Sequence, residues 1–311
     1  MVKFFIPFFF IVFISFGQNK KAFEIGVVLD NDSFSSLVND KYYTNGMEIF
    51  GNYISKKSNQ DVFKSNGFKI GQYIFNPKWV KSDFKEDHNR PYAGYLFAEF
   101  NQNRFYKNQT VWITKYQIGV VGPSSKAEDF QKWMHNAFGF GKIYGWQHQI
   151  KNTVALQYNT IFSTKVFDKI TTNKIDFHWQ SKAEIGTVFS SVTTGILTRI
   201  GLSKNLKAMQ QSNFYNSLMF EEKKVNELYF YFLPKINLQF YDATIQGSLF
   251  DVDSPLTFTP NFFRFKLETG LKYQMQNWNL GYTFHYTTQE IKSNSATGFY
   301  YGSVGMSYIF K

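Results

Sequence analysis

Two oxygen-rich clusters near the N-terminus could bind an ion or take part in catalysis. The first is Asp30-Asn31-Asp32, and the second is Tyr42-Tyr43-Thr44-Asn45-Gly46. Asp and Asn favour turns because their side chains bond to nearby backbone groups, but three in a row exceed what one turn needs. Carboxylate and amide oxygens are also the ligands that a hard cation such as Ca²⁺ prefers. The residues alone leave both interpretations open, a turn and a calcium site.

A second group of polar residues falls on a segment with a helical pattern. Ser125 and Glu128 have the spacing of a capping box, and Gly139 is a typical helix stop, so a short helix is expected between them. Gln131 and His135 are four residues apart and therefore share one face of that helix. Such a histidine is usually a surface or packing residue. Beside a cation, a neutral imidazole can instead act as a general base toward water.

Basic residues gather in the segment 76–90. They are Lys78, Lys81, Lys85 and Arg90. Lysines in a loop are by default solvated. At a membrane surface they could also contact the phosphates of an anionic glycolipid, because ammonium and guanidinium groups bind phosphate strongly. We expect no nucleic-acid partner, because these residues form no contiguous basic stripe.

The elements that must position these residues are strands. In Phe263–Tyr273, Phe, Leu and Tyr alternate with Arg, Lys, Glu and Gly, and the same period of two recurs in Leu280–Thr287 and Tyr300–Phe310. A helical period would scatter these sets around a cylinder, so the pattern predicts strands. About thirteen such windows occur. Because bacterial barrels have even strand numbers, we expect twelve, with fourteen as the alternative. The weakest places in this assignment are the short window Ala243–Phe250 and the ill-defined stretch Ile161–Asn173.

Composition favours a membrane-spanning sheet. Aromatic residues make up 20% of the 311 residues and charged residues only 18%. A soluble sandwich buries mainly aliphatic side chains between two sheets, whereas these strands are long and their apolar faces are rich in Phe and Tyr. Hydrocarbon requires a closed sheet with an apolar exterior and aromatic girdles. We therefore predict an all-β fold, an antiparallel transmembrane β-barrel of about twelve strands with a short helix in an extracellular loop.

The N-terminus and the cysteine count indicate the compartment. Residues 1–17 have the pattern of a secretory signal peptide, with Lys3 before an apolar run and the small Gly17 at the expected cleavage position. That run is shorter than the ~20 residues that span a bilayer. We expect residues 18–311 to form one barrel domain in the bacterial outer membrane. The absence of cysteine excludes a disulfide scaffold and thiolate chemistry.

Five motifs occur in an order that resembles the outer-membrane lipid A 3-O-deacylase family. They are Asn31-Asp32-x-Phe34, Asp40-x-Tyr42-Tyr43-Thr44-Asn45-Gly46, Arg90-Pro91-Tyr92-Ala93-Gly94, Gln131-x-x-x-His135 and Gly145-Trp146-Gln147-x-Gln149. Each motif is weak alone, but five in order are specific. The resemblance covers the whole chain after the signal. The family usually has Asp before the Arg-Pro motif, where this chain has Asn89, and this departure puts a charge-dependent role of that position in doubt.

The resemblance implies an enzyme that hydrolyses the ester of the 3-prime acyloxyacyl chain of lipid A and depends on Ca²⁺. Its site would lie between the barrel wall and a helix from an outer loop, with lipopolysaccharide as substrate. The positions that match the family's catalytic residues are His135, Asn31, Asp32, Thr44 and Gln131. Asn31 and Asp32 would also bind the metal. Lys78, Lys81 and Arg90 would contact the substrate.

Two other classes of function compete with this one. A phospholipase-type barrel needs a serine nucleophile in a histidine motif, and Tyr43–Gly46 contains neither residue. A non-catalytic barrel, either a porin or a glycolipid-binding protein, needs no paired clusters at its rim. It stays the alternative to the esterase.

Overall fold

The computed structural model describes residues 22–35, 42–57, 62–139, 141–203, 205–218, 226–251, 253–293 and 295–310. Within these ranges the side chain of Thr44 is not described. The predicted signal peptide, residues 1–17, lies outside the described residues and stays a prediction.

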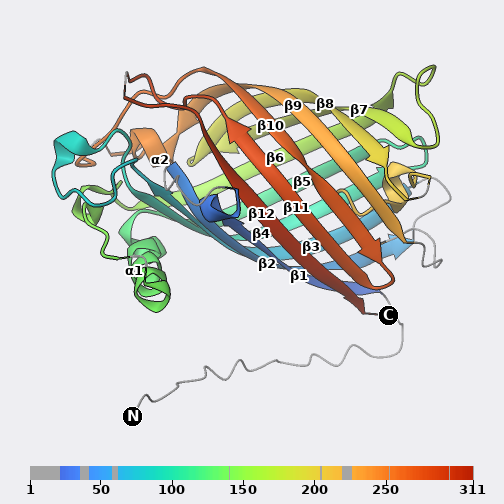
Figure 1. Cartoon of the computed structure of the whole chain (residues 1–311), viewed down its shortest axis with the longest axis horizontal. Helices are drawn as coiled ribbons and strands as arrows, with labels where there is room; N and C mark the ends of the chain where they lie inside the picture. Colours follow the sequence, from blue (N-terminus) through green and yellow to red (C-terminus); the bar gives the residue numbers. More distant parts are fainter. Residues whose placement is uncertain are drawn as a thin grey trace, which may run out of the picture.

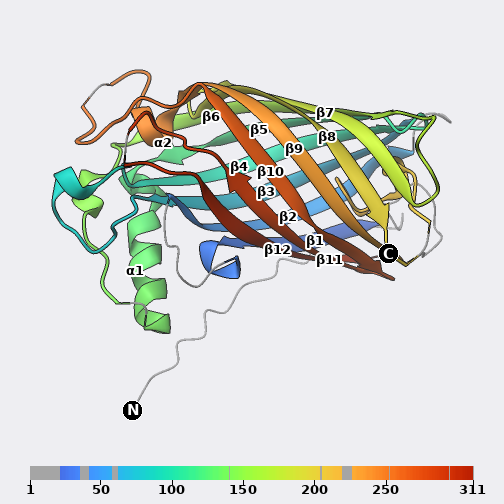
Figure 2. The ribbon, with the colours of Figure 1, turned by 45° about the horizontal axis from the view of Figure 1, so that its top comes forward.

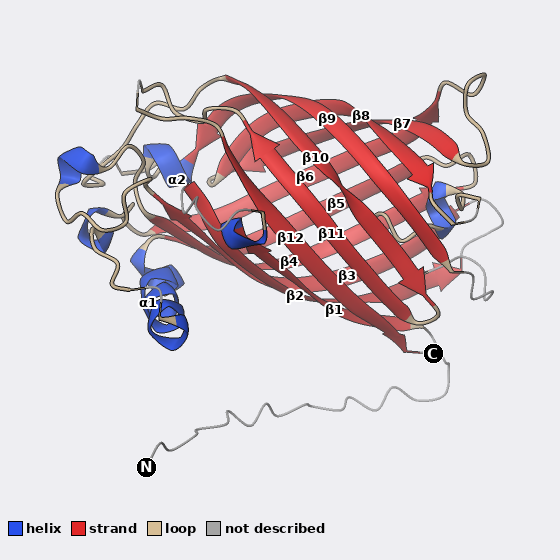
Figure 3. Ribbon diagram, in the orientation of Figure 1, coloured by secondary structure: helices blue, strands red, loops and turns tan. Residues whose placement is uncertain are grey.

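Twelve antiparallel strands form one closed barrel, in which each strand pairs with its neighbours along the chain and β1 pairs with β12 (Figures 1 and 3). The strands are β1 (Phe23–Asn31), β2 (Tyr42–Lys57), β3 (Val62–Asn76), β4 (Ala93–Tyr106), β5 (Val111–Val121), β6 (Thr153–Val166), β7 (Ile175–Gly186), β8 (Phe189–Gly201), β9 (Glu227–Asp242), β10 (Phe263–Met275), β11 (Trp278–Thr287) and β12 (Phe299–Phe310). The predicted fold and the count of twelve are confirmed.

The weakest predicted strand is a helix instead. Residues Ala243–Gln246 form the short helix α2, and the side chain of Asp242 caps it by accepting a hydrogen bond from the amide of Thr244. Asp, Asn, Ser and Thr at this position stabilise a first helical turn by satisfying its orphan N–H groups. The predicted strand at Ala243–Phe250 is therefore wrong, and without it the thirteen predicted strands become twelve.

Alternation divides each strand between lipid and lumen. In β10 the outward Phe263 and Phe265 are 59% and 37% exposed, while the intervening Arg264 is buried in the interior. Apolar side chains face the hydrocarbon of the membrane, because a charged side chain there would lose its hydration. Polar side chains face the lumen, where they pair with one another.

The amphipathic helix α1 (Ala127–Phe138) lies in the connection between β5 and β6. Its predicted end is confirmed, because Gly139 takes the left-handed conformation with φ of 73°. The predicted capping box is wrong: Lys126 precedes the helix without a side-chain cap, and the hydroxyl of Ser125 donates to the carbonyl of Gly122 at 2.6 Å. None of the helices in the described ranges is long and apolar enough to cross a membrane.

The two ends of the barrel differ. The α-helices α1 and α2 and the described parts of the connections 77–92, 122–152, 243–262 and 288–298 lie at one end, and the C-terminus lies at the other (Figure 1). Bacterial barrels place long loops outside the cell and their termini in the periplasm. We therefore assign the end with the helices to the cell exterior and call it the outer rim.

Residues 205–218, between β8 and β9, fold into the lumen from the periplasmic end, and we call them the plug. Met209 and Leu218 are buried there against the inner wall. Tyr215 accepts a hydrogen bond from Gln180 of β7 at 2.6 Å, and Asn216 donates to Ser65 of β3 at 2.5 Å. The plug thus bonds to two strands well separated around the barrel.

Candidate active site between the barrel wall and helix α1

The last residues of β1 present their side chains to opposite sides of the wall. Asn31 pairs with Asn45 of β2 across the sheet, and its amide donates to the Asn45 oxygen at 2.5 Å. The Asn31 oxygen accepts from the backbone N–H of Ser33 at 2.8 Å and from the Ser33 hydroxyl. These bonds orient Asn31 because each polar atom of its side chain has a fixed partner. Asn31 and Asn45 are therefore a polar pair on the outward face, at the outer rim.

Asp30 points into the lumen and fixes the end of the same strand. The hydroxyls of Tyr43 and Ser303 each donate to one of its carboxylate oxygens at 2.6 Å. Ser303 lies on β12 and also hydrogen-bonds to Nε2 of His285 at 3.0 Å. Bonds of this kind to a charged acceptor are stronger than neutral ones. Asp30 thus ties β1 to both neighbouring strands directly behind Asn31.

Asp32 begins a single 3-10 turn, residues Asp32–Phe34, and is 8% exposed. Its carbonyl accepts from the amide and the hydroxyl of Ser35 at 3.0 and 2.9 Å. The Tyr282 hydroxyl donates to the carbonyl of Phe34 at 3.1 Å and fastens the turn to β11. The two carboxylates therefore lie on different structures, Asp30 on the inner wall and Asp32 in the rim turn.

Thr44 lies at an irregularity in β2. The register between β2 and β3 shifts between Tyr43 and Asn45, so one extra residue occurs at Thr44. Such a bulge redirects side chains and is common near active sites. The predicted role of Thr44 depends on a side chain outside the described residues and stays a prediction.

Helix α1 is held to the wall by a small core outside the lumen. This core consists of Ile74, Tyr92, Ala127, Ile143 and Trp146, with Val80 and Phe130 packed against it. A side chain on Gly94 of β4 would collide with it, because a Cβ there would lie 2.2 Å from Cβ of Ala127. The amide of Gln72 on β3 donates to the Ser125 carbonyl at 2.6 Å. The wall thus offers a notch and a hydrogen bond to the start of α1.

Gln131 anchors the middle of the helix. It is 1% exposed, and its oxygen accepts a hydrogen bond from the Trp146 indole N–H at 2.9 Å. Trp146 also packs on Tyr92, with ring centroids 4.6 Å apart. Gln131 therefore supports the helix side of the site and is too buried to meet a substrate.

His135 lies one turn beyond Gln131 and is partly exposed. Gly139 and Gly141, with φ of 73° and 87°, reverse the chain so that the Gly141 carbonyl approaches Nδ1 of His135 at 3.2 Å. A carbonyl can only accept, so this contact favours the tautomer with hydrogen on Nδ1. Nε2 then keeps its lone pair, as a general base requires.

A crevice of about 100 Å³ separates α1 from the wall. The polar pair Asn31 and Asn45 lies in its lining, along with Gln72, and the remainder is mostly apolar. Phe130 and Met134 line it from the helix side. The structure therefore brings Asn31 together with the residue next to His135, although the His135 side chain itself is on the adjacent face of α1.

Oxygen donors at this rim suit a hard cation. Asn31, Asp32 and the nearby serines offer amide, carboxylate, hydroxyl and carbonyl oxygens, and no sulfur or imidazole. Ca²⁺ binds such mixed oxygen sets and completes them with water. Among the residues that the structure describes, no three His, Cys, Asp or Glu side chains gather as they would around a metal held by such side chains alone. These oxygen donors therefore fit a calcium site in which few of the ligands are carboxylates.

The predicted substrate-binding residues divide into two groups. Lys78 and Lys81 are exposed, and the Lys78 ammonium lies 5.0 Å from the ring centroid of Trp79. Arg90 is 1% exposed, donates to the Thr244 hydroxyl at 2.9 Å and faces Glu290 at 3.7 Å. The guanidinium is enclosed by these partners and does not lie at the exposed surface, and the predicted role of Arg90 in substrate binding stays a prediction.

Asn89, where the family usually has Asp, joins three segments of the rim. Its amide nitrogen donates to the Tyr42 hydroxyl at 2.9 Å and to the Ser295 carbonyl at 3.1 Å. Its oxygen accepts from the Lys78 amide at 3.1 Å. A carboxylate could not donate to the Ser295 carbonyl, so the amide is chemically required for this set of bonds.

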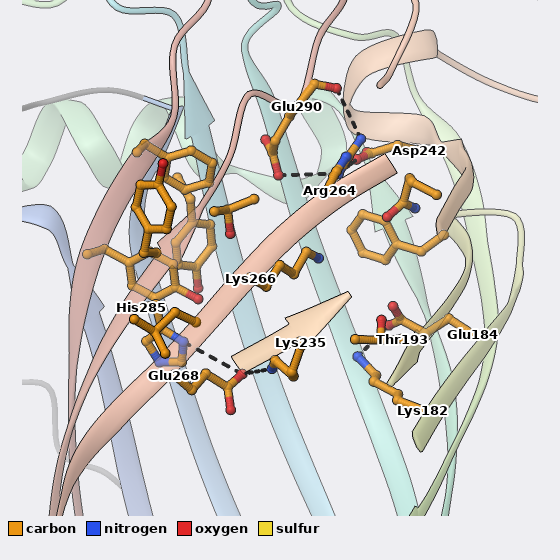
Figure 4. Close-up of a pocket in the computed structure, with 18 of the residues that line it drawn as sticks. Lys182, Glu184, Thr193, Lys235, Asp242, Arg264, Lys266, Glu268, His285 and Glu290 are labelled. Carbon is orange, nitrogen blue, oxygen red and sulfur yellow. Dashed lines mark hydrogen bonds and ion pairs between the residues drawn. The ribbon is translucent and has the colours of Figure 1, made fainter. Parts of the chain in front are cut away.

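The outer half of the lumen holds a separate cavity of about 290 Å³ (Figure 4). Its charges are largely paired: Lys235 of β9 with Glu268 of β10, Lys182 with Glu184 two positions along β7, and Arg264 of β10 with Asp242 and Glu290. The barrel wall separates this cavity from the crevice beside α1. Because most of these charges are neutralised by a partner, the cavity offers few groups for chemistry.

Sequence reasoning missed the role of Gln72. It stands at an outward position of β3, between the apolar Ile70 and Ile74, and this break in the alternation was a usable signal. A polar residue on the lipid face requires a partner. The partner, Ser125, is 53 residues away in the chain, so only the tertiary structure identifies it.

A family model and one solved structure agree with this architecture. A family model described as outer membrane protein LpxR matches residues 4–310. The solved structure of LpxR from Salmonella typhimurium superposes with a TM-score of 0.74 at 18% identity, over 93% of this chain and 100% of that chain. The β domain of the Bordetella autotransporter BrkA matches at a TM-score of 0.49 and 9% identity, over 93% of this chain and 98% of that one. No curated protein sequence matches the chain.

Proposed function

Because the chain belongs to the LpxR family of outer membrane proteins, we propose that it is a lipid A deacylase that removes the 3-prime acyloxyacyl chain by ester hydrolysis. The observation that carries this proposal is the crevice between α1 and the wall, where a polar amide pair adjoins an apolar lining. An ester of a long acyl chain has the same division, with a polar carbonyl next to a hydrocarbon chain.

Asn31, Asp32 and His135 would supply the polar chemistry. His135 Nε2 would take a proton from a water molecule as the water oxygen attacks the ester carbonyl. The ester C–O bond then breaks, and the imidazolium returns the proton to the departing sugar oxygen. The Gly141 contact at Nδ1 supports this role, because it keeps the ring in the required tautomer.

Asn31 and Asp32 would hold a calcium ion, which when bound would polarise the ester carbonyl and stabilise negative charge on its oxygen. Asn31 is oriented for this by Asn45 and Ser33. Thr44 would complete the rim side of the centre. Lys78 and Lys81, which are exposed at the same rim, would contact the phosphates of lipid A.

The proposal is tested with purified protein in detergent and purified lipid A, with the products followed by mass spectrometry. The wild-type protein with Ca²⁺ should release the 3-prime acyloxyacyl chain. His135→Ala, and separately removal of calcium by a chelator, should each reduce release at least a hundredfold, the scale of general-base and metal catalysis. Lys132→Ala, on the same helix but half exposed and paired only with Glu128, is the matched control and should keep full activity.

Each outcome has a defined meaning. If lipid A loses the same acyl mass with His135→Ala, and with the chelated wild-type protein, as with the wild type and Ca²⁺, then neither His135 nor calcium takes part in the mechanism. If even the wild-type protein releases no acyl chain but binds lipid A, the non-catalytic glycolipid-binding barrel becomes the better description. Heat-dependent mobility in gels shows that each variant retains its barrel.

A further inference from the structure

We propose that α1 is an in-plane membrane helix whose Trp133 inserts among the acyl chains of the outer leaflet. The occupant of this apolar helix face is thus lipid, and not a second protein. The inference depends on the barrel in its membrane and not on the esterase activity.

The orientation of the helix is the first argument. Figures 1 and 2 show α1 on the outer side of the wall near the rim, lying across the long axis of the barrel and not along it. A transmembrane barrel has its axis along the membrane normal within the tilt of its strands. A helix lying across that axis therefore runs roughly parallel to the membrane plane, which is the position of interfacial amphipathic helices.

The second argument is which face points where. Gln131 is fixed to Trp146 and so faces the rim loops, and Phe130 and Met134 face the wall. Each residue advances about 100° around an α-helix, so Trp133 lies roughly 200° from Gln131. Trp133 therefore faces away from the rim, toward the belt of the barrel. Trp133 is 62% exposed, and its ring contacts the Phe130 ring with the two centroids 5.8 Å apart.

The third argument is continuity with the lipid-facing wall. Gln72 of β3 bonds to Ser125 at the start of α1, and the next outward residue toward the middle of β3 is Ile70. Ile70 is 64% exposed, and Ile49 on the neighbouring strand β2 is 46% exposed. The exposed Trp133 thus extends an apolar surface that hydrocarbon already covers. Trp is favoured at this depth because its ring is apolar and its N–H is polar.

The face of the helix next to Trp133, on the side away from the wall, is polar. Lys132, 100° from Trp133, forms an ion pair with Glu128 at 2.5 Å, and both side chains remain in contact with solvent. This distribution is typical of a helix that lies in the interface with its apolar face down.

Site-directed labelling tests the inference cleanly, because the chain has no cysteine. Trp133→Cys and the matched control Lys132→Cys are each labelled with a nitroxide and folded into dilauroylphosphatidylcholine vesicles. Collision with oxygen, which concentrates in lipid, is compared with collision with a water-soluble nickel complex. The ratio of oxygen to nickel collisions should be several-fold higher at position 133 than at position 132.

A nickel accessibility at position 133 equal to that at position 132 would show that the helix stands clear of the lipid and would overturn the inference.

A second measurement does not depend on labelling. In the unlabelled protein, Trp133→Gln should increase hydrogen exchange of α1 in vesicles but not in detergent, whereas Lys132→Gln should leave it nearly unchanged in both. Equal exchange for Trp133→Gln and wild type in vesicles would also count against insertion. Neither measurement uses lipid A hydrolysis, so their failure is separable from failure of the proposed function.

Discussion

The indole N–H of Trp146 donates to the side-chain oxygen of Gln131 at 2.9 Å, in a site where both residues are 1% exposed. Fifteen positions separate them in the chain, and the bond fastens the middle of α1 to the loop that leads into β6. This buried hydrogen bond therefore adds to the apolar core and to the bond from Gln72 to Ser125 in holding the helix side of the crevice.

Gln131→Met should loosen α1 without unfolding the barrel. Methionine has a similar volume but no oxygen to accept the bond, and an unsatisfied buried donor costs about 1–3 kcal/mol. Amide hydrogen exchange across 127–138 should become about tenfold faster or more. Lys132→Met, at an exposed position of the same helix, should not change the exchange. Equal protection in both variants would mean that the bond contributes little to docking.

Gly94→Ala should displace α1 and reduce lipid A hydrolysis. A Cβ at residue 94 would lie 2.1 Å from the Ser125 hydroxyl and 2.2 Å from Cβ of Ala127, so the start of the helix must move. A displacement near 1 Å can cost about a hundredfold in rate. Gly305→Ala is the control, because its nearest atom would be 3.7 Å away. Turnover measured for the two variants should differ sharply, and similar rates would contradict the notch between wall and helix.

The outer loop around His88 should loosen in mild acid. His88 is 3% exposed, its Nε2 lies 3.0 Å from the Ser82 carbonyl, and burial lowers its pKa below the ordinary value. The folded loop therefore holds fewer protons than the unfolded one. Its stabilisation is complete above the ordinary pKa of about 6.5 and is lost as the pH falls through the folded-state pKa.

Hydrogen exchange of residues 77–92, expressed as protection relative to the intrinsic exchange rate at each pH, should therefore show less protection at pH 5 than at pH 7.5. Asp83, Asp87 and His148 also lie close to His88, with the His148 ring centroid 5.8 Å away. His88→Gln, which can still donate to Ser82, should remove most of the difference, whereas His148→Gln should retain it. A His88→Gln variant with unchanged pH dependence would assign the effect to another group.

The barrel should conduct ions poorly in a planar bilayer, because the plug occupies the periplasmic end of the lumen. Its residues bond to β3 and β7 through Asn216 and Tyr215. Replacement of 206–218 by a Gly-Ser linker should raise the single-channel conductance several-fold. High conductance in the intact protein would favour the porin function over the esterase.

Much of this architecture was predictable from the chain alone. Alternation at period two specified strands and their Phe- and Tyr-rich faces specified lipid, because these properties depend only on local side-chain chemistry and on the solvent outside. The rule of even strand numbers left twelve strands or fourteen, and the structure has twelve. Gly139 predicted the end of α1 for the same local reason, since glycine readily adopts the left-handed conformation. The ordered motifs predicted the family.

The tertiary structure decided the partnerships. Nothing local distinguishes Arg90, which the fold buries against Glu290, from Lys78, which it exposes at the rim. Likewise, adjacent residues Asp30 and Asn31 are chemically alike in the sequence, but the pleat of β1 sends one into the lumen and the other to the crevice. Burial and contact between residues distant in the chain depend on how the sheet closes, and closure is a property of all twelve strands together.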